Sequence, residues 1–295
     1  YAKEKDLQIV GDIPIYVALD SADVWSHPEL FQLDEENLTP LKVSGVPPDA
    51  FSEDGQLWGN PLYDWEKMEQ TDFAWWRSRM KASAKLYDAV RIDHFIGVVQ
   101  YYAIPYGAVT AKDGEWEKGP GKKLTDALDE AAGETKIIAE DLGIFVPEVK
   151  ELLEETGYPG MKIIEFAFSG DRFNEHLPHM YSPNSVVYGG THDNETLVGY
   201  FKPEARQWWE LQYIADYMGV SHQHEVVDKV LKTAYASVAS VVIFQAQDVL
   251  KLDSWARMNT PGTVGNNWRW RMKPGELTQD HINHLSWLVD TFGRF

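Results

Sequence analysis

Three carboxylic acids in this sequence each follow a short apolar run of the kind that predicts a buried strand. Asp93 ends the run "AVRID", Glu140 ends "KIIAE", and Asp193 ends "SVVYGGTHD". Cleaving a glycosidic bond requires two such groups: one attacks or stabilises the anomeric carbon, and the other, kept protonated, donates to the leaving oxygen. The three acids together favour sugar chemistry, although each one alone is also compatible with a salt-bridged or helix-capping residue.

The neighbours of two of these acids indicate different protonation states. Strand alternation places Arg91 on the same side as Asp93, so its guanidinium can hold Asp93 ionised and oriented as a nucleophile. The apolar residues before Glu140 would desolvate its carboxyl group and raise its pKa, as a general acid requires.

Histidines stand beside two of the acids. His192 and Asn194 flank Asp193 and offer hydrogen-bond donors to sugar hydroxyls. For His94, next to Asp93, a packed histidine and a ligand contact both stay open; a metal ligand is disfavoured because no second histidine follows at ligand spacing. No organic cofactor is implied, and this chemistry requires no metal.

Six short apolar runs predict parallel strands that are buried on both faces, with helices between them. One such helix is "PEVKELLEETG", where Pro147 suits the first turn and Gly157 can end the helix. This alternation is typical of an α/β fold. The runs are "LQIVGDIPIYV" from Leu7, "AVRID" from Ala89, "KIIAED" from Lys136, "MKIIEFAF" from Met161, "SVVYGGTHD" from Ser185 and "SVVIFQAQD" from Ser240.

Carboxylates at the ends of four runs, Asp12 included, favour a (β/α)8 TIM barrel over an open doubly wound sheet. Since only about six of the eight strand-helix units are found, we expect residues 1–295 to be a single catalytic barrel domain that is truncated at its N-terminal side. The missing N-terminal segment of the same protein is then an expected partner. The Pro- and Gly-rich span 18–70 predicts an inserted loop or subdomain after the first strand, bordering the active-site groove.

Composition narrows the ligand classes. The 295 residues carry 27 Lys+Arg against 46 Asp+Glu, a formal net charge of -19, which disfavours nucleic acid. Twelve Trp and fourteen Tyr either fill a large core or stack on sugar rings. The absence of cysteine suits a reducing cytoplasm, and no run approaches the roughly 20 apolar residues of a membrane span, so we expect a cytoplasmic protein with no membrane partner.

Six motifs, found in order along the chain, closely resemble those of the 4-α-glucanotransferases, also called amylomaltases or disproportionating enzymes, of glycoside hydrolase family 77. They are "GDIPIYV" from Gly11, "PPDAFSEDGQLWGNPLYDW" from Pro47, "RIDHF" from Arg91, "IAEDLG" from Ile138, "GGTHDN" from Gly189 and "MNTPGTVGNNWRWR" from Met258. Members of that family belong to the α-amylase clan, have a barrel core, and transfer α-1,4-glucan segments between maltooligosaccharides with retention. Full-length members also carry a long stretch before the third barrel strand that this chain lacks.

The resemblance implies roles for individual residues. Asp93 is the nucleophile, Glu140 the general acid/base and Asp193 the transition-state stabiliser, with Arg91 and His192 as their partners in the donor site.

Further substrate contacts follow from the same resemblance. Asp12 stands at the end of the third barrel strand, and residues 47–65 form a loop bordering the acceptor groove, where Trp58 and Asn60 are the expected contacts; a structural role for Trp58 is the alternative. Apart from the resemblance, the sequence leaves open whether Tyr16, Phe51, Trp58 and Trp268 are sugar platforms or pack in the core. The expected partners are maltooligosaccharides or other α-1,4-glucans.

Three other functions stay open from the sequence. An α-amylase-clan hydrolase would share all three carboxylates. A noncatalytic glucan-binding fragment would be indifferent to Asp93→Asn. A phosphate-binding barrel enzyme is less well supported, because the last strand is followed by "QDVLKLDSW", which lacks the glycines of a phosphate loop.

Overall fold

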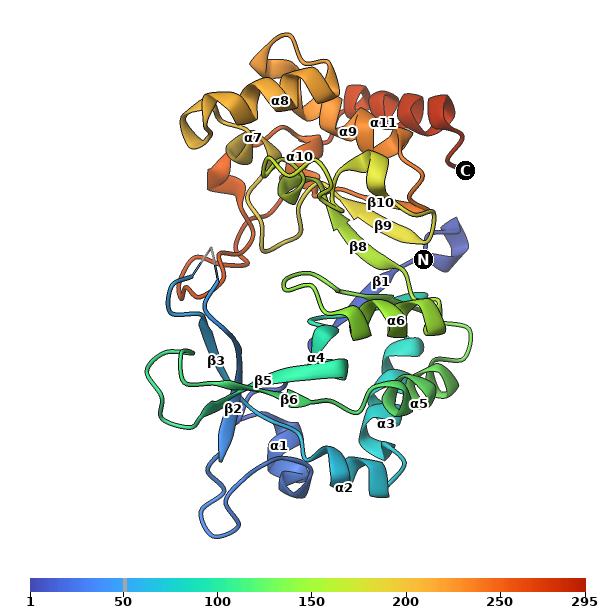
Figure 1. Cartoon of the computed structure of the whole chain (residues 1–295). Coiled ribbons are helices and arrows are strands. Elements are labelled where there is room, and N and C mark those ends of the chain that lie inside the picture. Colours follow the sequence, from blue (N-terminus) through green and yellow to red (C-terminus); the bar gives the residue numbers. More distant parts are fainter. Residues whose placement is uncertain (50–51) are drawn as a thin grey trace. The chain divides into compact units, whose positions relative to one another are not determined.

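The computed structural model describes residues 1–49 and 52–295, which divide into two units, Tyr1–Gly160 and Met161–Phe295 (Figure 1). Each unit has a three-stranded sheet and its own cluster of buried apolar side chains. The two units are therefore described separately.

The first unit is built on a parallel sheet in the order β1-β4-β7. Its strands, β1 (Val10–Ile13), β4 (Ala89–Ile92) and β7 (Lys136–Ala139), confirm three of the six predicted strands. The register pairs Asp12 with Arg91, and parallel pairing brings the carboxyl ends of all three strands to one edge. Asp93 and Glu140 follow directly at that edge.

Helices cover this sheet (Figure 1). Helices α3 (Ala74–Ala84) and α5 (Lys122–Ala132) pack against each other. Helix α6 (Pro147–Thr156) begins at Pro147 and ends at Gly157, whose φ of 73° is the left-handed conformation that glycine adopts without strain, as the sequence predicts. The shorter helices of this unit are α1 (Ala22–Ser26), α2 (Trp65–Gln70) and α4 (Ile96–Val99).

A four-stranded antiparallel sheet in the order β3-β2-β5-β6 also lies in the first unit, and the sequence analysis does not predict it. Strands β2 (Lys42–Val46) and β3 (Gln56–Pro61) come from the predicted insert. Strands β5 (Gln100–Pro105) and β6 (Glu115–Lys118) come from outside residues 18–70. The insert therefore contributes two strands to a sheet whose other two strands come from residues after Asp93.

The second unit has a sheet in the order β10-β9-β8, formed by β8 (Gly160–Ile163), β9 (Ser185–Tyr188) and β10 (Val241–Ile243). These are the other three predicted strands. Helix α9 (Val226–Ala236) packs against α8 (Trp208–Met218) and α11 (Gln279–Phe292), and two short helices, α7 (Leu197–Tyr200) and α10 (Ala246–Val249), follow β9 and β10 (Figure 1).

The strands and helices confirm an α/β class. Closure of the six strands into a barrel, and a single domain over residues 1–295, stay predictions. Across the described ranges, no helix combines the length and the apolar character needed to cross a membrane.

Candidate active site

In the first unit, one guanidinium joins two carboxylates. Nη1 of Arg91 lies 2.7 Å from Oδ1 of Asp12 and 2.8 Å from Oδ1 of Asp93. Arg91 is buried, which opposes its charge, but the carboxylates of Asp12, Asp93 and Glu140 raise the pKa of Arg91 above its ordinary value. A permanently charged arginine therefore holds and orients Asp93 through this ion pair, on the side of β4 that strand alternation predicts.

Glu140 has the opposite surroundings. It is 8% exposed, and burial, assisted by the negative charge of Asp93 and opposed by Arg91, raises the pKa of Glu140 to about 8. The backbone N–H groups of His94 and Leu142 donate to its two carboxyl oxygens, at 2.6 Å to Oε2 and 3.1 Å to Oε1. Glu140 is thus fixed in place and mostly protonated at neutral pH.

His94 links these two acids through its backbone. Its φ of 50° is in the left-handed region, which is strained for a residue with a side chain, and its N–H donates to Glu140. Its ring contacts Trp58 edge-on, with centroids 4.8 Å apart, and burial lowers the pKa of His94 to about 4, so the ring is neutral. Nε2 of His94 is buried and has no hydrogen-bond partner within the described part of the chain.

Aromatic side chains lie beside this group of acids. Trp58 is partly exposed on β3, and Asn60, two residues further, shares its face of the strand. Tyr16 is buried, with its ring centroid 6.3 Å from Trp58 and 6.0 Å from Tyr63. The structure thus brings Tyr16 and Trp58 together, whereas Phe51 lies outside the described residues.

Asp193 lies in the second unit, in the segment after β9. Its side chain is 41% exposed, and Oδ2 lies 3.5 Å from Nε2 of His192. The ring of His192 in turn lies 5.0 Å from that of Trp268. Oδ1 of Asn194 accepts hydrogen bonds from the backbone and hydroxyl of Thr191, so this amide also stabilises the turn that carries Asp193.

Two residues that the sequence analysis does not single out hold Asp193. Asn259 donates through Nδ2 to Oδ1 of Asp193 at 2.6 Å. Arg257 donates to the backbone carbonyl of Asp193 at 2.7 Å and to that of Asn259 at 2.9 Å. The two contacts with Asp193 span more than 60 residues of sequence, so the only available signal is that Asn259 falls within the "MNTPG" motif.

Two further acids are buried beneath this segment. Asp248 is fully buried, burial raises its pKa to about 7, and its Oδ1 accepts from the Leu197 N–H at 2.8 Å. Glu165 is also buried, which raises its pKa well above the ordinary value, and a Cβ on Gly190 would lie 2.7 Å from its Oε1. They follow β8 and β10, the strands on either side of β9, so both support the segment that carries Asp193.

The described residues contain no group of three or more His, Cys, Asp or Glu side chains able to hold a metal ion.

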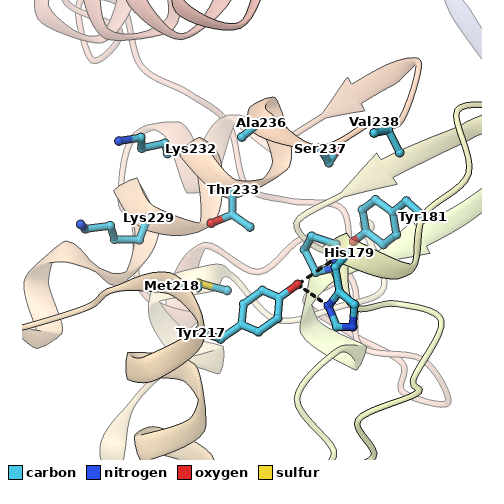
Figure 2. A pocket seen from close by; sticks show the side chains of 11 residues that line it. His179, Tyr181, Tyr217, Met218, Lys229, Lys232, Thr233, Ala236, Ser237 and Val238 are labelled. Atoms are coloured by element: carbon cyan, nitrogen blue, oxygen red, sulfur yellow. Dashed lines mark hydrogen bonds between the residues drawn. The ribbon is translucent and has the colours of Figure 1, made fainter.

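A pocket of about 500 Å³ in the second unit lies between α8, α9 and residues 178–181, and none of the predicted site residues lines it (Figure 2). The candidate site therefore consists of two groups, Asp12, Arg91, Asp93 and Glu140 with Tyr16, Trp58 and Asn60 in the first unit, and His192, Asp193 and Asn194 in the second.

Comparisons with known proteins agree with the resemblance found in the motifs. The chain is 48% identical to a 4-alpha-glucanotransferase of Clostridium butyricum over 294 residues, which are all of this chain and 60% of that protein. An amylomaltase from Streptococcus agalactiae, solved in complex with acarbose, superposes with a TM-score of 0.95 at 43% identity, over all of this chain and 59% of the other. An amylomaltase from Corynebacterium glutamicum shares the fold, with a TM-score of 0.74 at 18% identity over 90% of this chain and 43% of the other.

The chain thus spans about 60% of the length of the first two relatives. A model of the 4-alpha-glucanotransferases of glycoside hydrolase family 77 matches residues 1–278. Because this match covers well over half of the chain, the chain belongs to the family 77 4-alpha-glucanotransferases.

Proposed function

We propose that the protein containing this chain transfers α-1,4-glucan segments between maltooligosaccharides by a retaining double displacement. The observation that carries the proposal is the pairing of two unlike carboxyl groups around Arg91. Asp93 is ion-paired at 2.8 Å, whereas burial raises the pKa of Glu140 to about 8. Retaining glycosidases require this combination of an ionised nucleophile and a protonated acid.

In the first step, a carboxylate oxygen of Asp93 attacks the anomeric carbon while Glu140 gives its proton to the departing glycosidic oxygen. This leaves a glycosyl ester on Asp93 and an ionised Glu140. In the second step, Glu140 takes the proton of an acceptor 4-hydroxyl, whose oxygen displaces Asp93. Two inversions restore the α configuration. We assign to Asp193 the binding of sugar hydroxyls in the transition state.

The remaining predicted residues are proposed substrate contacts. Arg91 and Asp12 border the nucleophile, and His192 and Asn194 border Asp193. Trp58 presents a partly exposed indole, with Tyr16 behind it and Asn60 on the same strand face. An aromatic face beside hydrogen-bonding groups suits a pyranose ring. In this proposal the six predicted strands belong to one (β/α)8 barrel.

Transfer places a stronger demand on the site than hydrolysis does. Water at about 55 M competes with an acceptor at about 10 mM, so the site must favour the sugar by roughly four orders of magnitude, or about 5 kcal/mol. Acceptor binding and exclusion of water by the insert with its sheet β3-β2-β5-β6 would supply this preference.

The test is to incubate the native polypeptide that contains this chain with maltotriose alone and to separate the products by length. We expect glucose together with maltopentaose and longer products, and neither in the Asp93→Asn variant. Glucose and maltose without longer products would show that the protein is a hydrolase and not a transferase. Maltooligosaccharide binding without any reaction would leave a noncatalytic glucan-binding protein.

A further inference from the structure

Helix α8 presents two large aromatic side chains to solvent, in the second unit and apart from the residues assigned to catalysis. Trp208 is 77% exposed and Trp209 is 40% exposed, and they occupy the first two positions of the helix. Tryptophan is seldom so exposed, and neighbouring exposed aromatics are typical of binding surfaces.

These side chains border linked hollows along α8. One hollow of about 340 Å³ is lined by Arg172, Trp208, Trp209, Gln212, Tyr213, Asp216 and Tyr217. A second, of about 310 Å³, shares Trp208 and Gln212 with it, and the pocket of Figure 2 shares Tyr217. The α8 residues of the first hollow lie on one face of the helix, so this hollow runs along α8 from its first turn to the pocket of Figure 2, and we call it the α8 groove. The second hollow covers the same turns on a neighbouring face of the helix. This arrangement suits an extended ligand better than a compact one.

Several side chains that line the α8 groove make contacts that fix their position. The Arg172 guanidinium lies 3.7 Å from the centre of the Tyr213 ring, and Gln212 donates to Asp216 at 2.8 Å. The hydroxyl of Tyr217 contacts the backbone N–H and Nδ1 of His179, at 3.2 and 2.9 Å (Figure 2). Side chains that are already ordered lose little conformational entropy when a ligand binds.

The chemistry of the groove selects a class of ligand. Indole and phenol rings pack on the apolar C–H faces of pyranoses, while amide, carboxylate and guanidinium groups bind hydroxyls. The mixed charges of Arg172 and Asp216, in a chain of formal net charge -19, do not favour a polyanion. An extended, neutral chain of hydroxylated rings satisfies these conditions.

We propose that the α8 groove is a second glucan-binding site, at which an α-1,4-glucan chain lies across Trp208. The identity of the sugar rests on the proposed function; the groove itself does not. A second attachment point raises the effective concentration of a long chain at the active site, whereas a trisaccharide is too short to gain from it. The groove therefore adds affinity for long glucans and leaves the reaction of maltotriose unchanged.

The test compares Trp208→Ala and Trp208→Phe with Trp287→Ala in the native polypeptide. Trp287 is 48% exposed on α11 of the same unit and lines none of the three hollows. Retention is measured by native electrophoresis in gels containing amylose, and kinetics are measured with amylose and with maltotriose. We expect Trp208→Ala to lose most of its retention and to raise KM for amylose about five- to tenfold. Trp208→Phe should restore part of both, and Trp287→Ala should behave as wild type.

Two results would overturn the groove as a glucan site. One is unchanged retention of Trp208→Ala in a protein whose thermal unfolding matches wild type. The other is a change of oligomeric state in sedimentation velocity without a change in retention, which would make the face an interface between copies. Failure of the proposed function gives a different result. If the wild-type protein is retained through Trp208 but transfers no glucan, the groove is still a glucan-binding site and only the transferase proposal is wrong.

Discussion

The acids proposed for catalysis in the first unit and the acid proposed in the second are held by different kinds of partner. Asp93 and Glu140 lie around a buried arginine, and burial keeps the pKa of Glu140 near 8. Asp193 is more exposed than Glu140 and is held by the neutral amide of Asn259. The second unit has strongly buried acids too, but Glu165 and Asp248 lie beneath the segment that carries Asp193.

This difference matches two roles: an acid that transfers a proton in the first unit, and an acid that binds and positions the sugar in the second. A group that must give up and regain a proton needs a pKa near the working pH, which burial and neighbouring charges provide. A group that only binds sugar hydroxyls needs a fixed orientation and an unchanged charge, which a neutral hydrogen-bond donor provides. Changes in the first unit should therefore alter the chemistry itself, and changes in the second should mainly alter geometry or stability.

The largest effect is expected from removing either acid of the first unit. Asp93→Asn removes the nucleophile and Glu140→Gln removes the transferable proton, so kcat for maltotriose should fall by about 10³-fold or more in each. The matched control is Asp280→Asn, an exposed residue of α11. If Asp93→Asn kept a tenth of the wild-type rate, the assignment of the first unit to covalent catalysis would be wrong.

A smaller loss is expected from Asn259→Asp, which places a carboxylate against Asp193 across a contact of 2.6 Å. Loss of a hydrogen bond to a charged group costs about 1.5–3 kcal/mol, so kcat/KM at pH 7 should fall by about 10- to 100-fold. Activity should partly return toward acidic pH, where the two carboxyl groups share a proton.

A purely structural role for Asn259 predicts the loss without the recovery at acidic pH. Asn283→Asp makes the same change on the exposed surface of α11 and should leave the pH profile unchanged.

The pH dependence should follow Glu140. Because its pKa is raised to about 8, kcat/KM should fall above pH 8 by about tenfold per pH unit as the acid loses its proton. Asp93→Asn removes a negative charge that raises this pKa, so Glu140 should titrate at lower pH in that variant. Infrared spectra of the carboxyl groups, compared with Glu140→Gln, would measure both titrations. A Glu140 that titrates near pH 4 in the wild type would remove the basis for its role as the acid.

The smallest effect on activity, but a clear one on stability, is expected from Asp248→Asn. Asn keeps the acceptor for the Leu197 N–H, and it removes a carboxyl group whose pKa is raised from 3.8 to about 7. Between pH 4 and pH 7, Asp248 is ionised in the unfolded chain and still protonated in the folded protein. Ionisation therefore favours the unfolded chain, and Asp248 lowers the free energy of unfolding of the wild type increasingly over this range.

The gain in unfolding free energy from Asp248→Asn should thus be near zero at pH 4. It should grow to at most on the order of 4 kcal/mol at pH 7 and stay constant above that. Urea unfolding at these pH values measures it. A gain that does not depend on pH would show that Asp248 is not a buried, neutral acid.

The sequence predicts local features of this molecule better than distant ones. All six strands, and helix α6 with its Pro147 and Gly157 ends, are visible because apolar runs and helix-ending residues act over a few positions. The contact of Arg91 with Asp93 is predictable from alternation along one strand. Burial of Glu140 is predictable from the apolar residues before it.

Features that depend on distant partners are not predictable in this way. Strands β2 and β3 contain Gly45, Gly59 and Pro61 and show no clean alternation, and β2 also pairs with β5, which lies far along the chain. The amide of Asn259 reaches Asp193 across 66 residues, and the "MNTPG" motif that contains Asn259 does not indicate which residue it contacts. The exposure of Trp208 follows only from the packing of α8, because tryptophan in a helix is ordinarily assigned to the core.

The most direct test of the account is to trap the glycosyl ester on Asp93. Fluoride leaves α-maltosyl fluoride without help from an acid, so in Glu140→Gln the first step should proceed while the second, which needs a base, is slow. Mass spectrometry of the digested protein should then find one maltosyl group on the peptide that contains Asp93. A maltosyl group on a different carboxylate, or none while the fluoride is consumed, would contradict the assignment of Asp93 as the nucleophile.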